Sequence, residues 1–303
     1  MKKVIRNVSE LTISKESLSS MPYANRVMMV SPAYFNVENP INAHMRQSDG
    51  SLHKLDKNLA VEQWYNLKAT YEKLGFNVFV VDPVDELPDM VFCANQSFPY
   101  LDSCGNFNAV LSNMFNDTRN EEVSYINSFL IGQGYETHRI ASRTLGYYFE
   151  SMGDALWLPG YRFILGGYGF RTDKRIYQFL SETTNAPIAI FELKHPKFYH
   201  LDTCLSILDD KTALACKDAF TNEGWQLLNK IFPKVVEVPL HEADSPGFAC
   251  NAHCPDRRHV IIQKNCVQTN SNLKAAGFIP VEVDTSEFIK SGGSVFCMKL
   301  MFF

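Results

Sequence analysis

The residue types best suited to covalent chemistry in this sequence are a cysteine and a histidine, each in an apolar segment. Cys297 follows a glycine pair in GGSVFCMKL, and glycines let the backbone approach a ligand closely. A thiol becomes a nucleophile when positive charge or a paired base stabilises its thiolate. His200 lies in FYHLDTCLSI, where it could protonate a leaving amine and then activate water. Taken alone, a cysteine of this kind is more commonly a core residue, and a lone histidine is more commonly structural.

Acidic residues and amides add the features of a cation site. Glu150 and Asp154 lie in FESMGDAL, Asp202 follows His200 by two residues, and Asn95 ends the segment PDMVFCAN. In a strand, residues two apart share a face, so His200 and Asp202 are expected to point the same way. A guanidinium offers five N–H donors in a fixed fork, which carboxylates on opposite sides match best. Glu150, Asp202 and the amide of Asn95 would form such a cage. The plain alternative for FESMGDAL is a turn with solvated acids.

These residues occupy equivalent places in a segment that occurs five times. Each copy has a short apolar strand, a polar loop with Pro, Gly or acidic residues, and a second strand that carries the polar residues. The copies start at Gly75, Gly134, Asn185, Phe232 and Gly277. A nucleophile, a base, carboxylates and amides at equivalent points of five units are hard to explain by packing. If the units close into a ring, all five second strands point to one central site.

A strand and a helix are expected before each copy. Apolar residues at helical spacing from Val61 to Leu74 predict a helix that stops at Gly75. A capping box at Thr118 and Glu121 predicts the start of a second helix, and further helices are predicted over 176–180, 225–231 and 273–276. Strands are predicted from Val27, Phe107, Phe163, Thr212 and His259. The unit is therefore strand, helix, strand, loop, strand, with a period of roughly 45 to 60 residues, which is typical of propellers or arrays.

Composition excludes several classes of function. The chain has 303 residues, 46% of them apolar, and a net charge of −4, so neither nucleic acid nor an anionic membrane is expected as a partner. No apolar run is long enough to span a bilayer, and residues 1–24 lack the apolar stretch of a secretory signal. The eight cysteines have no disulfide-framework spacing, so a cytoplasmic protein with reduced thiols is expected. Residues 1–24 are interpreted as a disordered or peripheral arm, and residues 25–303 as a single domain.

A metal site is the alternative interpretation of one segment. Cys250, His253, Cys254 and His259 cluster in ACNAHCPDRRH, but zinc sites favour paired CxxC or HxxxH spacings. In a strand, Cys250 and Cys254 would lie about 13 Å apart at roughly 3.3 Å per residue, too far for one tetrahedral ion. We expect no metal here. The segment is interpreted as part of the fourth copy, with Asn251 near the site.

Five motifs taken together carry a family resemblance. They resemble, in the same order, the motifs of the guanidine-modifying superfamily, or penteins, which includes arginine deiminases, dimethylargininases and amidinotransferases. The motifs are PDMVFCAN (88–95), FESMGDAL (149–156), GYGFRTD (167–173), HLDT (200–203) and GGSVFCMKL (292–300). The resemblance covers most of residues 25–303. It implies an α/β fold, a five-bladed α/β propeller built of ββαβ repeats with pseudo-fivefold symmetry, and an enzyme that uses no cofactor.

The resemblance also implies roles for the residues that match these motifs. They are a nucleophile, a general acid and base, two guanidinium clamps and a ligand for the substrate carboxylate. In that order these are Cys297, His200, Glu150 with Asp202, and Arg171. Asp154 and Asn251 are expected to help bind the substrate. The expected partner is a small guanidino compound, arginine or a methylated arginine, and a homo-oligomer is compatible with the sequence.

Two asparagines point to one branch of the superfamily. Deiminases and dimethylargininases usually carry Asp where this chain has Asn95, and the segment MMVSPAYFNVENPINAHM, with Asn42, is similar to that of arginine dihydrolases of cyanobacterial arginine catabolism. We therefore expect a hydrolase that forms a thiouronium on Cys297 and converts arginine to ornithine, ammonia and carbon dioxide. The alternatives are a dimethylargininase or deiminase that releases citrulline, an amidinotransferase, and an inactive pentein that only binds. Residues 151–153 and 294–296 depart from the family's pattern and bear on substrate identity.

Overall fold

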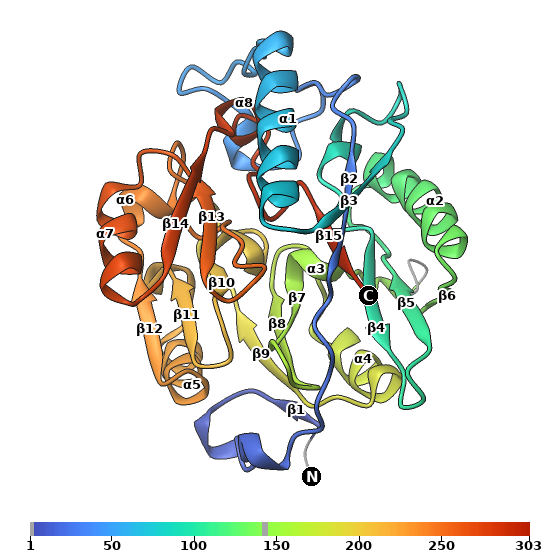
Figure 1. The fold of residues 1–303 in the computed structure, drawn as a ribbon, viewed down its shortest axis with the longest axis vertical. Coiled ribbons are helices and arrows are strands. Elements are labelled where there is room, and N and C mark those ends of the chain that lie inside the picture. The colour runs from blue at the N-terminus through green and yellow to red at the C-terminus, as the bar shows by residue number, and fades with distance from the viewer. Residues whose placement is uncertain (1–2, 141–144) are drawn as a thin grey trace.

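The strands form five separate sheets in the computed structural model, which describes residues 3–140 and 145–303. The first contains β1 (Val4–Ile5), β9 (Ile188–Glu192), β8 (Ile164–Tyr168) and β7 (Ala155–Trp157). The second contains β10 (Leu205–Ile207), β11 (Thr212–Ala215) and β12 (Lys234–Glu237). The third contains β13 (His259–Gln263) and β14 (Ile279–Val283). The fourth contains β15 (Leu300–Phe302), β2 (Arg26–Val30) and β3 (Asn77–Val81). The fifth contains β4 (Ser97–Leu101), β5 (Phe107–Leu111) and β6 (Glu136–Arg139). Figure 1 shows the sheets following one another around the middle of the molecule.

The sheets share one pairing pattern, which confirms the predicted unit of strand, helix, strand, loop and strand. The first strand of a unit pairs in parallel with the strand after the helix, as β5 does with β6. The unit's last strand pairs antiparallel with the first strand of the next unit: β4 with β5, β7 with β8, and β10 with β11. A single bridge, His253 to Ile261, stands in this place on β13. The last of these strands, β15, pairs with β2.

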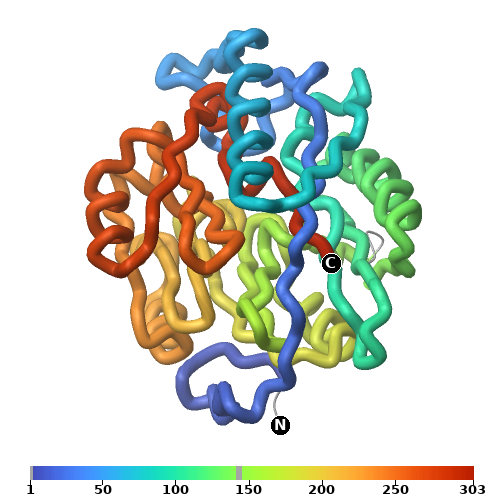
Figure 2. Tube along the Cα trace, in the orientation of Figure 1, coloured from blue at the N-terminus to red at the C-terminus, as the bar shows by residue number. Residues whose placement is uncertain are grey.

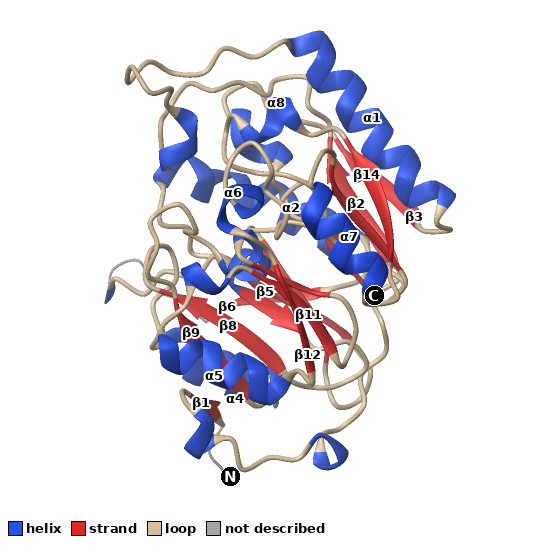
Figure 3. Cartoon of the chain, turned by 90° about the vertical axis from the view of Figure 1, so that its left-hand side faces the viewer, coloured by secondary structure: helices blue, strands red, loops and turns tan. Residues whose placement is uncertain are grey.

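Within each of the five units a helix joins the two parallel strands, because parallel neighbours need a crossover connection. These helices are α1 (Lys57–Lys73), α2 (Asp117–Gly132), α4 (Ile176–Thr184), α5 (Asn222–Ile231) and α7 (Val267–Ala275). The short helices α3 (Ser151–Asp154), α6 (Leu240–Ala243) and α8 (Ser286–Ile289) lie in the loops that follow the parallel pairs. Figure 3 shows α1 beside β2, β3 and β14 at the upper right, and α4 and α5 near β8 and β9 at the lower left.

Helix α1 illustrates why the sequence forms these elements. The side chain of Asp56 accepts hydrogen bonds from the backbone of Asn58 and Leu59 and so caps the helix. Trp64, Leu67 and Tyr71 are buried and recur at helical spacing, which ties the helix to the sheet of β2 and β3. The predicted capping box in the second helix is wrong. Asn116 caps α2 instead, because its amide oxygen accepts from the backbone N–H of Arg119.

The first residues of the described chain are packed on a sheet. Val4 and Ile5 pair in parallel with Ile188 and Ala189 of β9, and Ile5 is completely buried. From there the chain passes along the sheets before it enters β2, as Figure 2 shows in blue. Of the two interpretations of residues 1–24, the packing of β1 favours a peripheral segment held by the domain over a disordered one.

The described part of the chain also bears on membrane and metal chemistry. Within residues 3–140 and 145–303, no helix is both long and apolar enough to cross a bilayer. Over the same residues, no three His, Cys, Asp or Glu side chains lie close enough together to hold a metal ion. All eight cysteines are free, and seven of them are buried.

Candidate active site

The polar residues of the five units lie in the turns just before the antiparallel strands, not within those strands as predicted. Asn95 precedes β4, Glu150 is the N-cap of α3 before β7, and His200 is the N-cap of a 3₁₀ helix, Leu201–Thr203, before β10. Asn251 lies in a bend, and Cys297 lies in a turn before β15. A turn can present neighbouring side chains to the same side, whereas a strand alternates them. The turns therefore gather these residues more densely than strands would.

The expected same-face relation of His200 and Asp202 is accordingly wrong. Asp202 lies within the 3₁₀ helix that His200 caps, so the two side chains serve different partners. His200 contacts Glu150, and Asp202 contacts Cys297. The imidazole of His200 and the thiol of Cys297 thus each have a carboxylate beside them.

The thiol of Cys297 lies in a buried polar cluster. Its Sγ is 3.3 Å from Oδ2 of Asp202 and 3.2 Å from Nδ2 of Asn251, and Cys297 is only 3% exposed. Burial, and then the carboxylate of Asp202, raise the pKa of the Cys297 thiol well above its usual range. Burial likewise raises the pKa of Asp202, to about 7. The raised pKa favours the protonated thiol, and added positive charge would favour the thiolate.

Asn251 fixes the turn that carries the nucleophile. Its Oδ1 accepts hydrogen bonds from the backbone N–H groups of Ser294 (3.1 Å) and Cys297 (3.3 Å). Its Nδ2 donates to the backbone oxygen of Asp202 at 3.0 Å as well as to the thiol. One amide therefore joins the turn before β15 to the 3₁₀ helix of Asp202. In this structure Asn251 holds the backbone and the thiol of Cys297, and its contact with substrate stays a prediction.

Glu150 and His200 form the second half of the cluster. Nε2 of His200 lies 2.6 Å from Oε2 of Glu150, and Nη1 of Arg171 lies 3.3 Å from the same oxygen. The backbone N–H of Phe115 donates to Oε1 at 2.9 Å. Burial opposes ionisation of Glu150, but Arg171 and the hydrogen bond with His200 outweigh it and lower its pKa to about 2. Glu150 is therefore an anion that orients the imidazole.

Asp154 is hydrogen bonded to the backbone of the segment that carries His200. Its Oδ1 accepts from the backbone N–H of Leu201 at 3.0 Å, directly after His200. Burial raises the pKa of Asp154 to about 7. The hydroxyl of Tyr177 donates to the backbone oxygen of Asp154 at 2.8 Å. These contacts give Asp154 a structural role, and its predicted contact with substrate is untested.

The amide of Asn95 has a defined orientation. Nη1 of Arg119 lies 3.3 Å from Oδ1 of Asn95, and a guanidinium has donors but no acceptor, so the amide oxygen must face Arg119. Nδ2 is buried and has no hydrogen-bond partner in the described chain. A Cβ on Gly153 would lie 2.2 Å from this nitrogen and 3.2 Å from Cγ of His200. Gly153 is therefore required for the close approach, and Nδ2 lies on the side of His200.

Arg171 and Asn42 connect the same cluster to the loop before α1. Nη2 of Arg171 donates to the backbone oxygen of Ile41 at 2.7 Å, and its guanidinium lies 4.9 Å from the centroid of the Tyr199 ring. Nδ2 of Asn42 donates to the backbone oxygen of Ser291 at 2.9 Å. Both residues therefore lie next to the cluster. Arg171 was predicted to bind the carboxylate of the substrate, and in this structure it contacts the carboxylate of Glu150.

Sequence reasoning missed four buried charged residues here, Arg119, Glu122, Asp89 and Lys299. Arg119 pairs with Glu122 at 3.0 Å and also reaches Asn95. Asp89 accepts from Oγ of Ser291 at 3.1 Å; burial raises its pKa, while the charges of Arg119 and Arg171 oppose that rise. Lys299 lies two residues after the nucleophile and is completely buried. The signals were available: Arg119 falls on the buried face of α2, and Asp89 and Lys299 lie inside quoted motifs.

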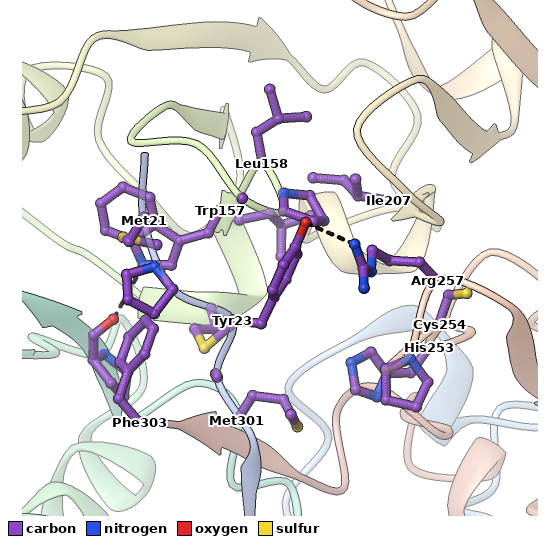
Figure 4. A pocket seen from close by; sticks show the side chains of 18 of the residues that line it. Met21, Tyr23, Trp157, Leu158, Ile207, His253, Cys254, Arg257, Met301 and Phe303 are labelled. Carbon is purple, nitrogen blue, oxygen red and sulfur yellow. Dashed lines mark hydrogen bonds between the residues drawn. The ribbon is translucent and has the colours of Figure 1, made fainter. Parts of the chain in front are cut away.

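A cavity of about 120 Å³ is lined by Lys299 among others, but by none of the nine predicted site residues. Met152, Phe296 and Lys299 line this cavity and lie within two residues of Glu150 or Cys297 in the sequence. Figure 4 shows Tyr23 reaching across the cavity to Arg257, to which it is hydrogen bonded at 2.9 Å. The side chains of His200 and Cys297 are enclosed, with exposed fractions of 1% and 3%.

Comparisons with known proteins agree with this geometry. The family model for "N,N dimethylarginine dimethylhydrolase, eukaryotic" matches residues 31–303. An N(G),N(G)-dimethylarginine dimethylaminohydrolase of Mycobacterium tuberculosis is 36% identical over 92% of this chain and 86% of its own length. The bifunctional arginine dihydrolase/ornithine cyclodeaminase ArgZ of Synechocystis is 30% identical over 91% of this chain, which spans only 37% of that longer protein.

Solved structures show the same mixed α/β fold. The N-terminal domain of ArgZ, an arginine dihydrolase from the ornithine-ammonia cycle in cyanobacteria, superposes with a TM-score of 0.82 at 29% identity, over 91% of this chain and 97% of that domain. A dimethylarginine dimethylaminohydrolase superposes with a TM-score of 0.74 at 21% identity, over 92% of this chain and 99% of that one. With the family model covering nearly all of the chain and a Cys, a His–Glu pair and a buried carboxylate in one cluster, this protein belongs to the dimethylarginine dimethylaminohydrolase family of guanidine-modifying hydrolases.

Proposed function

We propose that the protein hydrolyses the guanidino group of arginine through a covalent intermediate on Cys297 and continues to ornithine, as an arginine dihydrolase does. The overall reaction consumes two waters and yields ornithine, carbon dioxide and two ammonia. Cys297, His200 and Glu150 are the proposed catalytic residues. Asp202, Asn95, Arg171 and Asn42 are proposed to bind the substrate, together with Asp154 and Asn251.

The charges of the cluster account for activation of the thiol. Burial and the adjacent Asp202 carboxylate favour the protonated thiol of Cys297. A guanidinium bound between Asp202 and Glu150 places a positive charge beside the sulfur and favours the thiolate. The substrate cation therefore generates the nucleophile that attacks it, and a neutral ligand of the same shape would do so less well.

The His200–Glu150 pair is suited to both proton transfers. Sγ of Cys297 forms a bond to the guanidino carbon, and the bond to one terminal nitrogen breaks as His200 gives that nitrogen a proton. Water then attacks the thiouronium carbon and loses a proton to His200, and the carbon–sulfur bond breaks. Glu150 stays ionised throughout, because its pKa is about 2, and so stabilises the imidazolium form.

Buried charges near this cluster favour an amino-acid substrate over a simple guanidine. Burial raises the pKa of Asp89, and the charges of Arg119 and Arg171, which are also buried, oppose that rise. A carboxylate and two guanidinium groups complement the ammonium and the carboxylate of an α-amino acid. Binding of the substrate carboxylate by Arg171 would require it to share or release its contact with Glu150.

The observation that carries the dihydrolase proposal is the orientation of Asn95. Its buried Nδ2 lies on the side of His200 with no partner among the described residues. A guanidinium has only donors and cannot accept from this NH₂ group, whereas the oxygen of a ureido group can. Asn95 is therefore matched to citrulline, the product of the first hydrolysis. An Asp at this position would instead favour the cation and let citrulline leave.

The experiment is a product balance with purified enzyme. Arginine should give ornithine and about two ammonia per arginine, with citrulline only transient, and added citrulline should be consumed. Stoichiometric citrulline that is never consumed would rule out the second hydrolysis and leave a deiminase. Amidino transfer to an added amine in place of water would indicate a transferase, and no reaction with any guanidino compound would indicate a binding module.

A dimethylargininase is the second candidate, and the family model together with the Mycobacterium tuberculosis relative favours it. This activity would convert N-methylated arginines to citrulline and a methylated amine. It is separated from the first proposal by comparing kcat/KM for arginine and for asymmetric dimethylarginine in the same preparation. A strong preference for the methylated substrate, with no consumption of citrulline, would support this candidate.

The finer architecture is also a proposal. We infer a five-bladed α/β propeller with pseudo-fivefold symmetry over residues 25–303, with residues 1–24 as an arm. The support is the cyclic pairing, in which the last strand of a unit joins the first strand of the next in three units, a single bridge takes this place at β13, and β15 joins β2. A cytoplasmic location and a homo-oligomeric state are proposed from the sequence alone and can be tested by fractionation and by light scattering.

A further inference from the structure

The ring of Tyr199 carries the guanidinium of Arg171. The Cζ atom of Arg171 lies over this ring, 4.9 Å from its centroid, which is within the range of a cation–π contact. Tyr199 is partly buried and directly precedes His200 in the sequence. The contact therefore joins the arginine that is proposed to bind the substrate carboxylate to the segment that carries the proposed general acid and base.

Three neighbours hold the Tyr199 ring in place. Its hydroxyl donates a hydrogen bond to the backbone oxygen of Gly292. The ring of His200 lies 4.8 Å away and the ring of His44 lies 6.3 Å away, both measured between centroids. His44 is itself anchored, because its Nε2 lies 2.9 Å from the backbone oxygen of Lys197. Tyr199 therefore offers Arg171 a fixed surface.

The polar contacts of Arg171 are not equally close. Its Nη2 donates to the backbone oxygen of Ile41 at 2.7 Å, whereas its Nη1 lies 3.3 Å and 3.5 Å from the two carboxylate oxygens of Glu150. A substrate carboxylate at Nη1 would compete with Glu150 and leave the contacts with Ile41 and Tyr199 intact. A π face attracts a guanidinium without engaging its N–H groups. The guanidinium can therefore turn its Nη1 toward the substrate while it stays on the ring.

We propose, on the basis of the hydrolase function above, that Tyr199 is a positioning residue that holds Arg171 for the substrate carboxylate. The ring keeps the guanidinium in place while Nη1 exchanges the carboxylate of Glu150 for that of arginine. Through its hydroxyl, the same side chain holds Gly292, which begins the segment that leads to Cys297. The effect of the ring on substrate binding passes through Arg171, and the effect of the hydroxyl passes through the backbone.

The first experiment separates the ring from the hydroxyl. Tyr199→Leu removes both, and Tyr199→Phe keeps the ring. Relative to Tyr199→Phe, Tyr199→Leu should lower kcat/KM for arginine by about 2- to 30-fold, through a higher KM. The same comparison with argininamide, in which a neutral amide replaces the carboxylate, should show little change. Equal losses for both substrates would indicate a merely structural role and overturn the proposal.

The second experiment asks whether Tyr199 acts through Arg171. Arginine kinetics of wild type, Tyr199→Leu, Arg171→Ala and the double variant form a double-mutant cycle, and Tm values show which variants are folded. Tyr199→Leu should reduce kcat/KM much less in the Arg171→Ala background than in the wild type. Independent losses at the two positions would contradict the proposal. If Tyr199→Leu does not fold, Tyr199→Met takes its place with the same expectations.

Binding measurements separate an error about Tyr199 from an error about the reaction. Calorimetry in a Cys297→Ser background gives Kd for arginine without turnover. If Tyr199→Leu weakens binding there and Tyr199→Phe does not, while the wild type converts no guanidino compound, the role of Tyr199 stands and the hydrolase function fails. If the wild type hydrolyses arginine but Tyr199→Leu leaves Kd unchanged, the role of Tyr199 fails alone. Absence of arginine binding in the Cys297→Ser parent would overturn both.

Discussion

Asn95→Asp should convert the proposed dihydrolase into an enzyme that releases citrulline. Asn95 is 1% exposed, its oxygen faces Arg119 at 3.3 Å, and its NH₂ group lies on the side of His200. In the variant one carboxylate oxygen would keep the contact with Arg119. The other would present an acceptor where the wild type presents a donor, so the ureido oxygen of citrulline would lose its partner and meet a negative charge.

The size of the effect follows from that exchange. Leaving a buried polar group unpaired costs about 1–3 kcal/mol, which corresponds to a loss of roughly 5- to 160-fold in kcat/KM for citrulline. Binding of the arginine cation should be unchanged or stronger, because a charge-assisted hydrogen bond replaces a contact with no acceptor. The ratio of kcat/KM values for arginine and citrulline should therefore rise by at least this factor.

The assay follows ornithine and citrulline by chromatography with each substrate supplied separately. Asn58→Asp is the matched control, because it adds the same charge at an exposed position in the first turn of α1 and should leave both rates unchanged. If Asn95→Asp still consumes citrulline as efficiently as the wild type does, the argument from the amide orientation is refuted.

The remaining predictions concern catalysis, substrate binding, stability and pH. Cys297→Ser should abolish turnover without lowering Tm, because a serine hydroxyl is a poor nucleophile at neutral pH; residual activity above a few per cent, or no mass-shifted Cys297 peptide in quenched wild type, would sink the covalent route. Arg171→Ala should raise KM for arginine strongly, with a loss of kcat/KM equivalent to about 2–4 kcal/mol. If the wild type hydrolyses guanidines that lack a carboxylate at the same rate as arginine, Arg171 does not bind the substrate carboxylate. Ile5→Ala should lower the free energy of unfolding by about 2–4 kcal/mol, measured by urea titration, whereas an unstructured arm would show no change. The pKa of Glu150 in the folded protein is about 2, below its ordinary value of 4.5. Ionised Glu150 should therefore add about 3 kcal/mol to the free energy of unfolding when the pH is above that ordinary pKa, and this contribution should be lost as the pH falls toward 2. Urea titrations of wild type and Glu150→Gln that fail to converge in acid would contradict this.

The repeated unit was predictable because its signals are local. The strands from Val27, Phe107 and Thr212 are apolar runs, and the structure places β2, β5 and β11 there. The helix predicted from Val61 to Leu74 corresponds to α1. Its buried face is visible in the sequence as apolar residues at helical spacing, and its end as Gly75, which has a positive φ. Capping was less predictable, because several polar residues near position 117 could each serve as the cap.

The membership of the site was more predictable than its geometry. The motifs located Cys297, His200 and Glu150, which the structure brings together with their carboxylate partners. The turn conformation around His200 was not predictable from alternation, because a single turn of 3₁₀ helix has no periodic pattern to detect. The charges of Asp89 and Arg119 went unnoticed, since a buried ion network depends on which turns meet in space and not on sequence spacing.

The pairing of β15 with β2 has a consequence for the order of folding. Leu300 pairs with Met28, so almost the whole described chain lies between the two partners, and such contacts form late because a large loop must close first. The turn that carries Cys297 immediately precedes β15 and is held against Asn251 and Asp202. Until that strand docks, the thiol is an ordinary exposed cysteine without its carboxylate neighbour. Pulsed alkylation during refolding should therefore report when the fold is complete. The thiol of Cys297 should become protected from alkylation only in the final phase of refolding.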